Sequence, residues 1–304
     1  TTATTTHISS FKGHNNAVLQ ACWSPDSKHI CSVSADKSVM VWDSASQRRV
    51  RRYSRDHDAI VNSCSSVAHI MYSAHSSADA SHLFVTGSDD RTAKLFDVRC
   101  KQSVHSLSCQ YPVLSVAMSA DEVFTAGVDE VIKVWDRRMN TVTYTMSTTT
   151  TSSVGAVDGT ITGIQLSPDG NSLLSCSMDG SLCLWNVKPF FEGSLNSSAP
   201  VASSRLIKQI AGAVTYGPDK NLVRCAWSSN GKHISCGSAD IPNHVYVWDC
   251  GSCSVGNSAS TVHLRHRLPG HRDAVNDVAF HPTQPILASA SSDHTVILSE
   301  LEHI

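Results

Sequence analysis

The sequence has 304 residues, a formal net charge of −2 at neutral pH and only 16% charged residues, against about a quarter in an average soluble domain. A nearly neutral chain has no overall electrostatic reason to bind nucleic acid or an anionic membrane, so any such contact must come from a local patch. No apolar run approaches the length of a membrane span, and the Thr-rich residues 1–6 lack the regions of a signal peptide. We therefore expect a soluble, intracellular protein.

The 11 cysteines do not have the spacing of a disulfide scaffold or of a four-ligand zinc site. Cys250 and Cys253 form one CxxC pair without a second pair, so we expect a loop there. Free cysteine inside an apolar strand behaves as a small hydrophobic residue, and five cysteines fit that description: Cys22, Cys31, Cys176, Cys225 and Cys236. We expect a reducing compartment, no metal and no cofactor.

A pattern of about forty residues recurs along the chain and is first seen in residues 11–43. It begins with Gly13-His14, passes through two turns and ends in Trp42-Asp43. Five further copies follow, and the six copies reach their third-strand position at Trp42, Phe96, Trp135, Trp185, Trp248 and Ser299. The sequence therefore predicts six copies of one supersecondary unit.

Each copy carries polar residues at a set distance before that position. An aspartate stands six residues before it in five copies and eight before it in the fifth copy, and a hydroxyl residue precedes the aspartate by four in five copies. The residues expected to form this network are His14, Ser32, Asp36, Trp42, His57, Thr86, Asp90, Thr125, Asp129, Trp135, Ser175, Asp179, Trp185, Asp240, Trp248, His271, Ser289 and Asp293. Such a network satisfies the buried indole and imidazole groups of a blade, whereas a Ser-His-Asp hydrolase triad would not recur in every copy.

The predicted strands follow one another in chain order within each copy. Third strands are apolar on both faces, as expected for strands packed between neighbouring blades. Outer strands are expected at 48–53, 103–107, 141–146, 205–210 and 263–268. Ser- and Thr-rich loops are expected at 72–82, 147–153, 192–204 and 251–261.

The Gly-His and Trp-Asp ends of these copies resemble the WD-repeat family. That resemblance implies an all-β fold, a β-propeller built from four-stranded antiparallel blades. We expect one propeller domain over residues 7–304, after a Thr-rich tail at 1–6. Its repeats are expected at about 11–53, 54–107, 108–146, 154–210, 219–268 and 269–304. The resemblance also implies that residues 7–11 pair beside 295–301 and close the ring.

Several segments resemble more specifically the WD-repeat subunits of the spliceosomal U5 small nuclear ribonucleoprotein, notably LWNVKPF at 184–190 and LPGHRDAVNDVAFHP at 268–282. The resemblance implies a nuclear, non-enzymatic scaffold that docks spliceosomal proteins during pre-mRNA splicing. Its chief partner would be the large U5 core protein, with RNA contact at most secondary, no membrane and no small-molecule substrate. That family has seven repeats and six are found here, so the sequence leaves open whether the ring has six or seven blades.

An arginine-rich segment is the sharpest local feature outside the repeats' shared positions. The candidate partner-binding residues are Arg48, Arg49, Arg51, Arg52 and Arg55, with Arg137 and Arg138 at a similar position of the third copy. They could face an acidic protein or RNA phosphates, or simply keep an outer strand soluble.

Two other functions stay open at this point. Residues 96–99 and 135–138 resemble the WDxR box of substrate receptors for cullin-based ubiquitin ligases. A propeller can also read peptide tails through its central channel. No phosphate loop, zinc-ligand spacing or nucleophile elbow occurs in the sequence, so we do not expect an enzyme.

Overall fold

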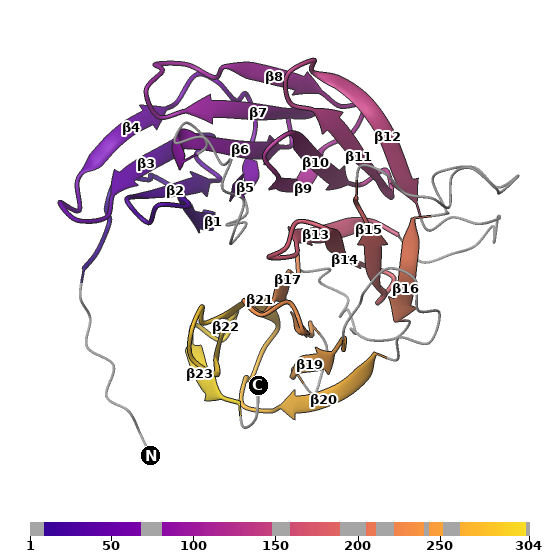
Figure 1. Ribbon diagram of the computed structural model, residues 1–304. Coiled ribbons are helices and arrows are strands. Elements are labelled where there is room, and N and C mark those ends of the chain that lie inside the picture. The colour runs from indigo at the N-terminus through magenta and orange to yellow at the C-terminus, as the bar shows by residue number, and fades with distance from the viewer. Residues whose placement is uncertain are drawn as a thin grey trace, which may run out of the picture.

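A computed structural model describes residues 9–67, 81–147, 159–188, 205–210, 222–239, 243–251 and 262–301. These residues form six antiparallel sheets arranged around a common centre (Figure 1). No described segment forms a helix with the length and apolarity needed to span a bilayer. The all-β, bladed fold class expected from the sequence is confirmed.

The strands of each sheet follow one another in the sequence. The first three blades are β1 (Val18–Trp23), β2 (His29–Ser34), β3 (Val39–Asp43) and β4 (Arg49–Tyr53); β5 (Val61–Ser66), β6 (Leu83–Ser88), β7 (Thr92–Asp97) and β8 (His105–Ser108); and β9 (Val113–Met118), β10 (Glu122–Gly127), β11 (Val131–Asp136) and β12 (Thr141–Ser147). The last three are β13 (Ile161–Leu166), β14 (Ser172–Ser177), β15 (Leu182–Asn186) and β16 (Leu206–Ile210); β17 (Cys225–Trp227), β18 (His233–Gly237), β19 (Val245–Asp249) and β20 (His263–Leu268); and β21 (Val275–Phe280), β22 (Ile286–Ser291) and β23 (Val296–Glu300).

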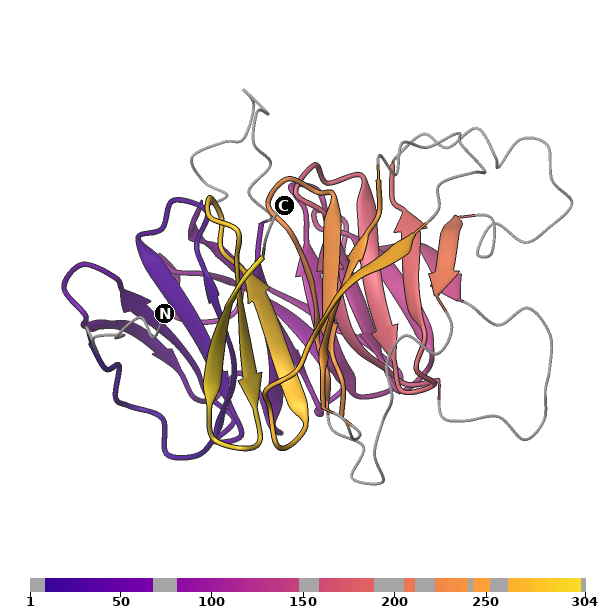
Figure 2. The same cartoon turned by 90° about the horizontal axis from the view of Figure 1, so that it is seen from below.

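Each blade is a meander whose first strand lies at the centre of the ring and whose last strand lies at the rim (Figure 1). Seen edge-on, the strands of every blade run between the two broad faces of the disc (Figure 2). The outer strands expected from the sequence lie at β4, β8, β12, β16 and β20. Loops on the two faces and side chains on the rim are therefore the parts of the molecule that can contact partners.

The core consists of apolar side chains packed between neighbouring blades. One buried cluster joins each consecutive pair of blades, which gives five clusters from the first blade to the sixth. In the first of them Val41 and Tyr53 of one blade pack against Val61, Phe84 and Phe96 of the next. Strands that are covered on both faces in this way need the continuous apolar pattern seen in the sequence.

Polar groups also connect the innermost strands of neighbouring blades. Gln20 of β1 accepts the backbone N–H of Cys64 at 2.9 Å, and Gln165 of β13 accepts the backbone N–H of Trp227 in the same manner. Ser115 of β9 likewise accepts the backbone N–H of Ile164 at 3.0 Å. Each of these bonds satisfies a central-strand donor that no strand of its own blade can reach.

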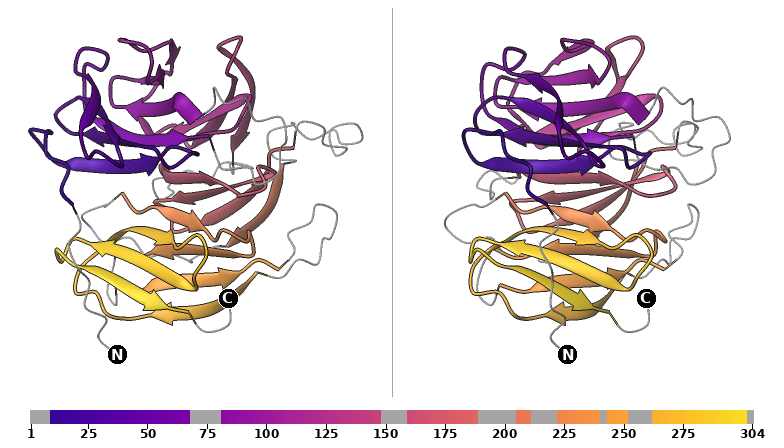
Figure 3. Two further views of the ribbon diagram at one scale, coloured as in Figure 1. Left: turned by 60° about the vertical axis from the view of Figure 1, so that its left-hand side comes forward. Right: turned by 90° about the vertical axis from the view of Figure 1, so that its left-hand side faces the viewer.

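The first and last blades share no apolar cluster within the described residues, and the ribbons stand apart in two views (Figures 1 and 3). Val18 of β1 is 54% exposed, although Val61 at the same register position of the second blade is fully buried. At the other end Val296 is 68% exposed, whereas its counterpart Val39 is 1% exposed. The described residues therefore form six blades, and among them Val18 of the first blade and Val296 of the last are exposed where their counterparts are buried.

The expected closing strand is not formed by the described part of residues 7–11. The last sheet has three strands instead of four, and residues 9–11 have no strand conformation. Phe11 instead packs edge-on against Trp42, with ring centroids 5.7 Å apart. The prediction was wrong for these residues because the apolar ring of Phe11 is held by its own blade; residues 7 and 8 lie outside the described part.

Tyr53 tests how much the contact between the first two blades contributes to stability. Its hydroxyl lies 3.0 Å from the backbone oxygen of Asp97 and 3.1 Å from that of Cys100. We expect Tyr53→Phe to lower the free energy of unfolding by about 1 kcal/mol, because the buried carbonyls lose their donor. Urea denaturation measures the change.

Tyr144→Phe is the matched control for this substitution. The Tyr144 hydroxyl is buried without a hydrogen-bond partner among the described residues, so its removal should leave the stability unchanged or raise it. Equal losses in the two variants would contradict the assigned role of the Tyr53 hydroxyl.

Candidate docking surface and blade-corner network

The first blade contains the complete polar network expected from the sequence. His14 Nδ1 lies 3.1 Å from a carboxylate oxygen of Asp36, and His14 Nε2 lies 2.8 Å from Ser32 Oγ. Trp42 Nε1 donates to the same hydroxyl at 2.8 Å. The four side chains therefore form one connected chain of hydrogen bonds across the blade.

The direction of these bonds follows from the chemistry of the two end groups. An indole N–H can only donate and an ionised carboxylate can only accept. Ser32 thus accepts from Trp42 and donates to His14 Nε2, so Nδ1 carries the imidazole hydrogen and donates to Asp36. Because the Ser32 oxygen is buried and already accepts the indole hydrogen, this Ser-His-Asp set holds the blade and is not arranged as a nucleophile.

The second and sixth blades keep the histidine, hydroxyl and aspartate but lack the tryptophan. His57 joins Asp90 at 2.7 Å and Thr86 at 2.8 Å. In the sixth blade His271 joins Asp293 at 3.0 Å and Ser289 at 2.8 Å. Phe96 and Ser299 carry no indole donor, so in these blades the histidine, hydroxyl and aspartate form the hydrogen-bonded set without a tryptophan.

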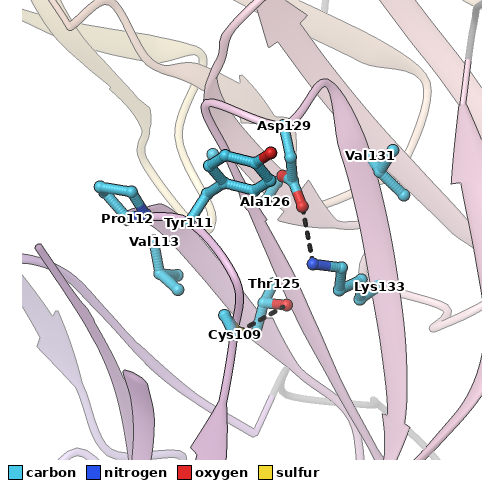
Figure 4. A pocket seen from close by; sticks show the side chains of 10 residues that line it. Cys109, Tyr111, Pro112, Val113, Thr125, Ala126, Asp129, Val131 and Lys133 are labelled. Carbon is cyan, nitrogen blue, oxygen red and sulfur yellow. Dashed lines mark hydrogen bonds and ion pairs between the residues drawn. The ribbon is translucent and has the colours of Figure 1, made fainter. Parts of the chain in front are cut away.

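The third and fourth blades keep the tryptophan and lack the histidine. Trp135 donates to Thr125 at 2.9 Å, and Trp185 donates to Ser175 at 2.9 Å. In the third blade Lys133 takes the place of histidine and pairs with Asp129 at 2.7 Å, with the Cys109 thiol 4.0 Å from Thr125 (Figure 4). In the fourth blade Asp179 accepts the backbone N–H of Ser181 at 2.8 Å.

The fifth blade departs furthest from the pattern. Trp248 is buried opposite Ile234 of the neighbouring strand, while Asp240 lies outside the described residues. Cys236 occupies the position of the hydroxyl, and its thiol donates to the backbone oxygen of Arg224 at 3.4 Å. The sequence predicts an irregular copy here because the aspartate is displaced by two residues, and the enlarged turn expected at 241–243 lies mostly outside the described residues.

The environment of the blade aspartates favours their ionised form. Burial by itself would raise the pKa of Asp36, but hydrogen bonds from Ser38, the backbone N–H of Asn15 and His14 lower that pKa far below its usual value. The pKa of Asp90 is lowered in the same way against burial, chiefly by His57 and Thr92. Hydrogen bonds from Thr295 and a backbone N–H lower the pKa of Asp293.

The arginine-rich segment comprises β4 and the residues on either side of it, at the rim of the first blade (Figure 1). Arg48, Arg49, Arg52 and Arg55 are exposed, and none of them forms an ion pair with a described carboxylate. Arg51 is different, because its guanidinium donates to the backbone oxygens of Val98 and Arg99 at 3.0 and 3.3 Å and so connects two blades. We call the four exposed arginines the β4 basic patch.

Other rim arginines interact within their own blades. Arg99 forms an ion pair with Asp97 at 2.7 Å, and Arg138 pairs with Asp121 at 3.3 Å. Arg265 pairs with Asp249 at 3.2 Å. Arg137 is half-buried beside Arg138 in the turn between β11 and β12 of the third blade, whereas β4 belongs to the first blade, so the predicted arginines do not form one surface.

A cavity of about 720 Å³ occupies the centre of the ring and is lined by the innermost strand of every blade. Its charged lining residues are Arg224 and Asp277. Burial raises the pKa of the Asp277 carboxyl, and the nearby Arg224 opposes this effect. Arg224 also donates to the backbone oxygen of Asn62 at 2.7 Å, which links the fifth blade to the second.

Sequence reasoning did not identify several of these contacts. Lys133 could have been found, because it follows Asp129 by four residues in a copy that lacks the histidine. The bonds of Gln20, Gln165 and Arg224 join residues far apart in the sequence, and no local pattern marks them.

Asp36→Ala tests the blade network. We expect this substitution to lower the free energy of unfolding by about 1–3 kcal/mol, because His14, Ser38 and a backbone N–H lose their acceptor, while binding at the surface is kept. Asp179→Ala, whose aspartate faces no histidine, should have a smaller effect. Unchanged thermal unfolding of the Asp36 variant would refute the assignment.

The lowered aspartate pKa values also predict how stability depends on pH. The folded protein holds these carboxyls ionised at pH values where the unfolded chain, with a pKa near 3.8, binds protons. Their contribution is therefore complete above about pH 5 and is lost as the pH falls through the acid range.

Urea midpoints at pH 5, 4 and 3 should thus decrease in that order, and Asp36→Asn should flatten the decrease because its amide does not titrate. A midpoint that rises on acidification, or an identical slope in the variant, would contradict this account.

Comparison with known proteins places the chain in a family. Residues 5–43, 49–97, 148–186 and 262–298 match the family described as WD domain, G-beta repeat. A solved structure titled "Crystal Structure of Mitotic Checkpoint Complex" contains a chain with the same fold, with a TM-score of 0.70 at 19% identity over 95% of this chain and 76% of that one.

Curated relatives are more specific. The U5 small nuclear ribonucleoprotein 40 kDa protein of Dictyostelium discoideum is 38% identical over 97% of this chain and 73% of its own length. The pre-mRNA-splicing factor cwf17 of Schizosaccharomyces pombe is 34% identical over 95% of this chain and 73% of its own length. The human U5 40 kDa protein is 38% identical over 86% of this chain and 62% of its own length. The chain therefore belongs to the WD-repeat family and, within it, to the family of the U5 small nuclear ribonucleoprotein 40 kDa proteins.

Proposed function

We propose that this chain is a scaffold subunit of the U5 small nuclear ribonucleoprotein, acting in the nucleus by docking other proteins during pre-mRNA splicing. The observation that carries the proposal is the 38% identity to a U5 40 kDa protein over 97% of the chain, since this similarity extends beyond the repeat motifs. The family is non-enzymatic, and the buried, fully bonded Ser32 and His14 agree with a structural role for the polar network.

The β4 basic patch is the part of the surface that we propose binds the chief partner, the large U5 core protein. Paired rim arginines, such as Arg99 and Arg138, already have a carboxylate partner within their own blade. The arginines of the β4 basic patch have none among the described residues, so their charge is available to an acidic protein surface. Arginine suits this purpose because its planar guanidinium binds carboxylates through two hydrogen bonds. RNA contact is secondary in this proposal.

The ion pairs that Arg99 and Arg138 each form with an aspartate also bear on the rival function of a ubiquitin-ligase receptor. These are the last residues of the two WDxR-like boxes, and both guanidinium groups are held by local aspartates. No observation favours the ligase function over splicing, so it serves as an outcome of the experiment below.

Affinity purification of the tagged chain from nuclear extract, followed by mass spectrometry and RNA analysis, tests the proposed function. We expect the U5 proteins and U5 RNA to be recovered. Recovery of a cullin adaptor, or of chromatin and short peptides, without U5 components would overturn the proposal.

A charge reversal within the β4 basic patch tests the docking surface separately. Arg48→Glu combined with Arg52→Glu should reduce the recovery of U5 proteins severalfold, because rim charges govern how fast and how selectively partners associate. Arg138→Glu is the matched control and should keep recovery near that of the unchanged protein. Equal recovery in all three proteins would exclude the patch while leaving the splicing function in place.

A further inference from the structure

Three cysteine side chains from two blades meet at the interface between the first blade and the second. Cys22 of β1 and Cys31 of β2 are directly opposed across the strand pair, and Cys64 comes from β5 of the next blade. Their three sulfur atoms all lie within 4.8 Å of one another, which no other trio of His, Cys, Asp or Glu in the described ranges achieves. The sequence did not reveal this group, because Cys64 stands 33 residues beyond Cys31.

A similar trio at another blade interface serves as a comparison, because its thiols are buried and form hydrogen bonds to the backbone. Cys225 and Cys236 are opposed across strands of the fifth blade, and Cys176 belongs to the fourth blade. Each thiol of this second trio donates to a backbone oxygen: Cys176 to Val223 at 3.2 Å, Cys225 to Gly163 at 3.8 Å and Cys236 to Arg224 at 3.4 Å. In the first trio Cys64 donates to the Cys31 backbone oxygen at 3.7 Å, and the sulfur atoms are gathered more tightly.

The first trio also has access to solvent and a compensating charge. Cys22 and Cys64 line the central cavity, so an ion can reach them from the channel. Arg224 lines the same cavity and donates to the backbone oxygen of Asn62, two residues before Cys64. Three thiolates and one Zn²⁺ carry a net charge of −1, which a single guanidinium balances.

We propose that Cys22, Cys31 and Cys64 bind one Zn²⁺ ion that ties the first blade to the second. Zinc is bound by thiolates at about 2.3 Å, which places the sulfur atoms of a tetrahedral site about 3.8 Å apart, so small side-chain adjustments bring this trio to that spacing. The three thiols each release a proton on binding. The fourth position faces the channel, where water completes the coordination.

The consequence of this site concerns the stability of the first blade. Among the described residues, the first blade shares a buried apolar cluster with the second blade alone. An ion held by both blades stabilises the folded state by mass action, because the unfolded chain does not hold the three thiols together.

The experiment uses the full chain with Cys100→Ser and Cys253→Ser, which removes the exposed Cys100 thiol and the Cys253 thiol of the CxxC pair. The reduced, metal-free protein is titrated with Zn²⁺ against a chromophoric chelator, and Co²⁺ is used as a spectroscopic probe for thiolate-to-metal charge transfer. We expect one ion per chain and a higher melting temperature with zinc. Cys22→Ser and Cys64→Ser should each lower the affinity at least about 10-fold and abolish the zinc-dependent rise in melting temperature.

Cys176→Ser is the matched control, because it alters the second trio and should leave affinity and stoichiometry unchanged. If Cys64→Ser does not fold, Cys22→Ser still decides the matter, since Cys22 is only half-buried. Absence of zinc binding, binding that persists in Cys22→Ser, or equal loss in Cys176→Ser would overturn the proposal. Uptake of Cu⁺ without uptake of Zn²⁺ would overturn the identity of the ion.

Discussion

The contact between the face of one blade and the face of the next is the interaction on which the rest of this structure depends. Every buried apolar cluster joins two consecutive blades. Side chains at these interfaces must be complementary in shape, because protein interiors are close-packed. The packing also determines the positions of the central cavity and the rim. Val18 of the first blade and Val296 of the last are exposed, although their counterparts in other blades are buried.

The polar network of each blade supplies hydrogen-bond partners to groups that this packing buries. Burying an indole or an imidazole between apolar sheets leaves donors that water cannot reach, and the first blade satisfies them with the chain from Trp42 to Asp36. Other blades satisfy the same corner with fewer members, as Lys133 does in place of histidine beside Asp129. The corner therefore tolerates different residues as long as each buried donor finds an acceptor.

The two binding features that we propose, the β4 basic patch and the cysteine trio, lie outside the polar network of the blades. On the rim, Arg99, Arg138 and Arg265 each pair with a nearby aspartate, whereas the arginines of the β4 basic patch have no ion-pair partner among the described residues. At the first blade interface three thiols gather within 4.8 Å of one another, and among them Cys64 donates to a backbone oxygen, whereas each thiol of the second trio does so. The thiol cluster arises where two blades meet and the basic patch lies on the exposed rim of one blade, and neither belongs to the repeat motif.

The amino-acid sequence alone determined the six copies of the repeat, the all-β bladed fold and, in the first blade, the four members of the polar network, because spacing within a repeat is local and a strand alternates at a regular period. It also carried the resemblance to a spliceosomal family. Tertiary structure alone decided that Phe11 packs on Trp42 rather than closing the ring, that Arg51 bridges blades while Arg52 stays exposed, and that Cys64 joins Cys22 and Cys31. Contacts between blades join residues from separate repeats, and no local spacing in the sequence specifies which side chains meet there.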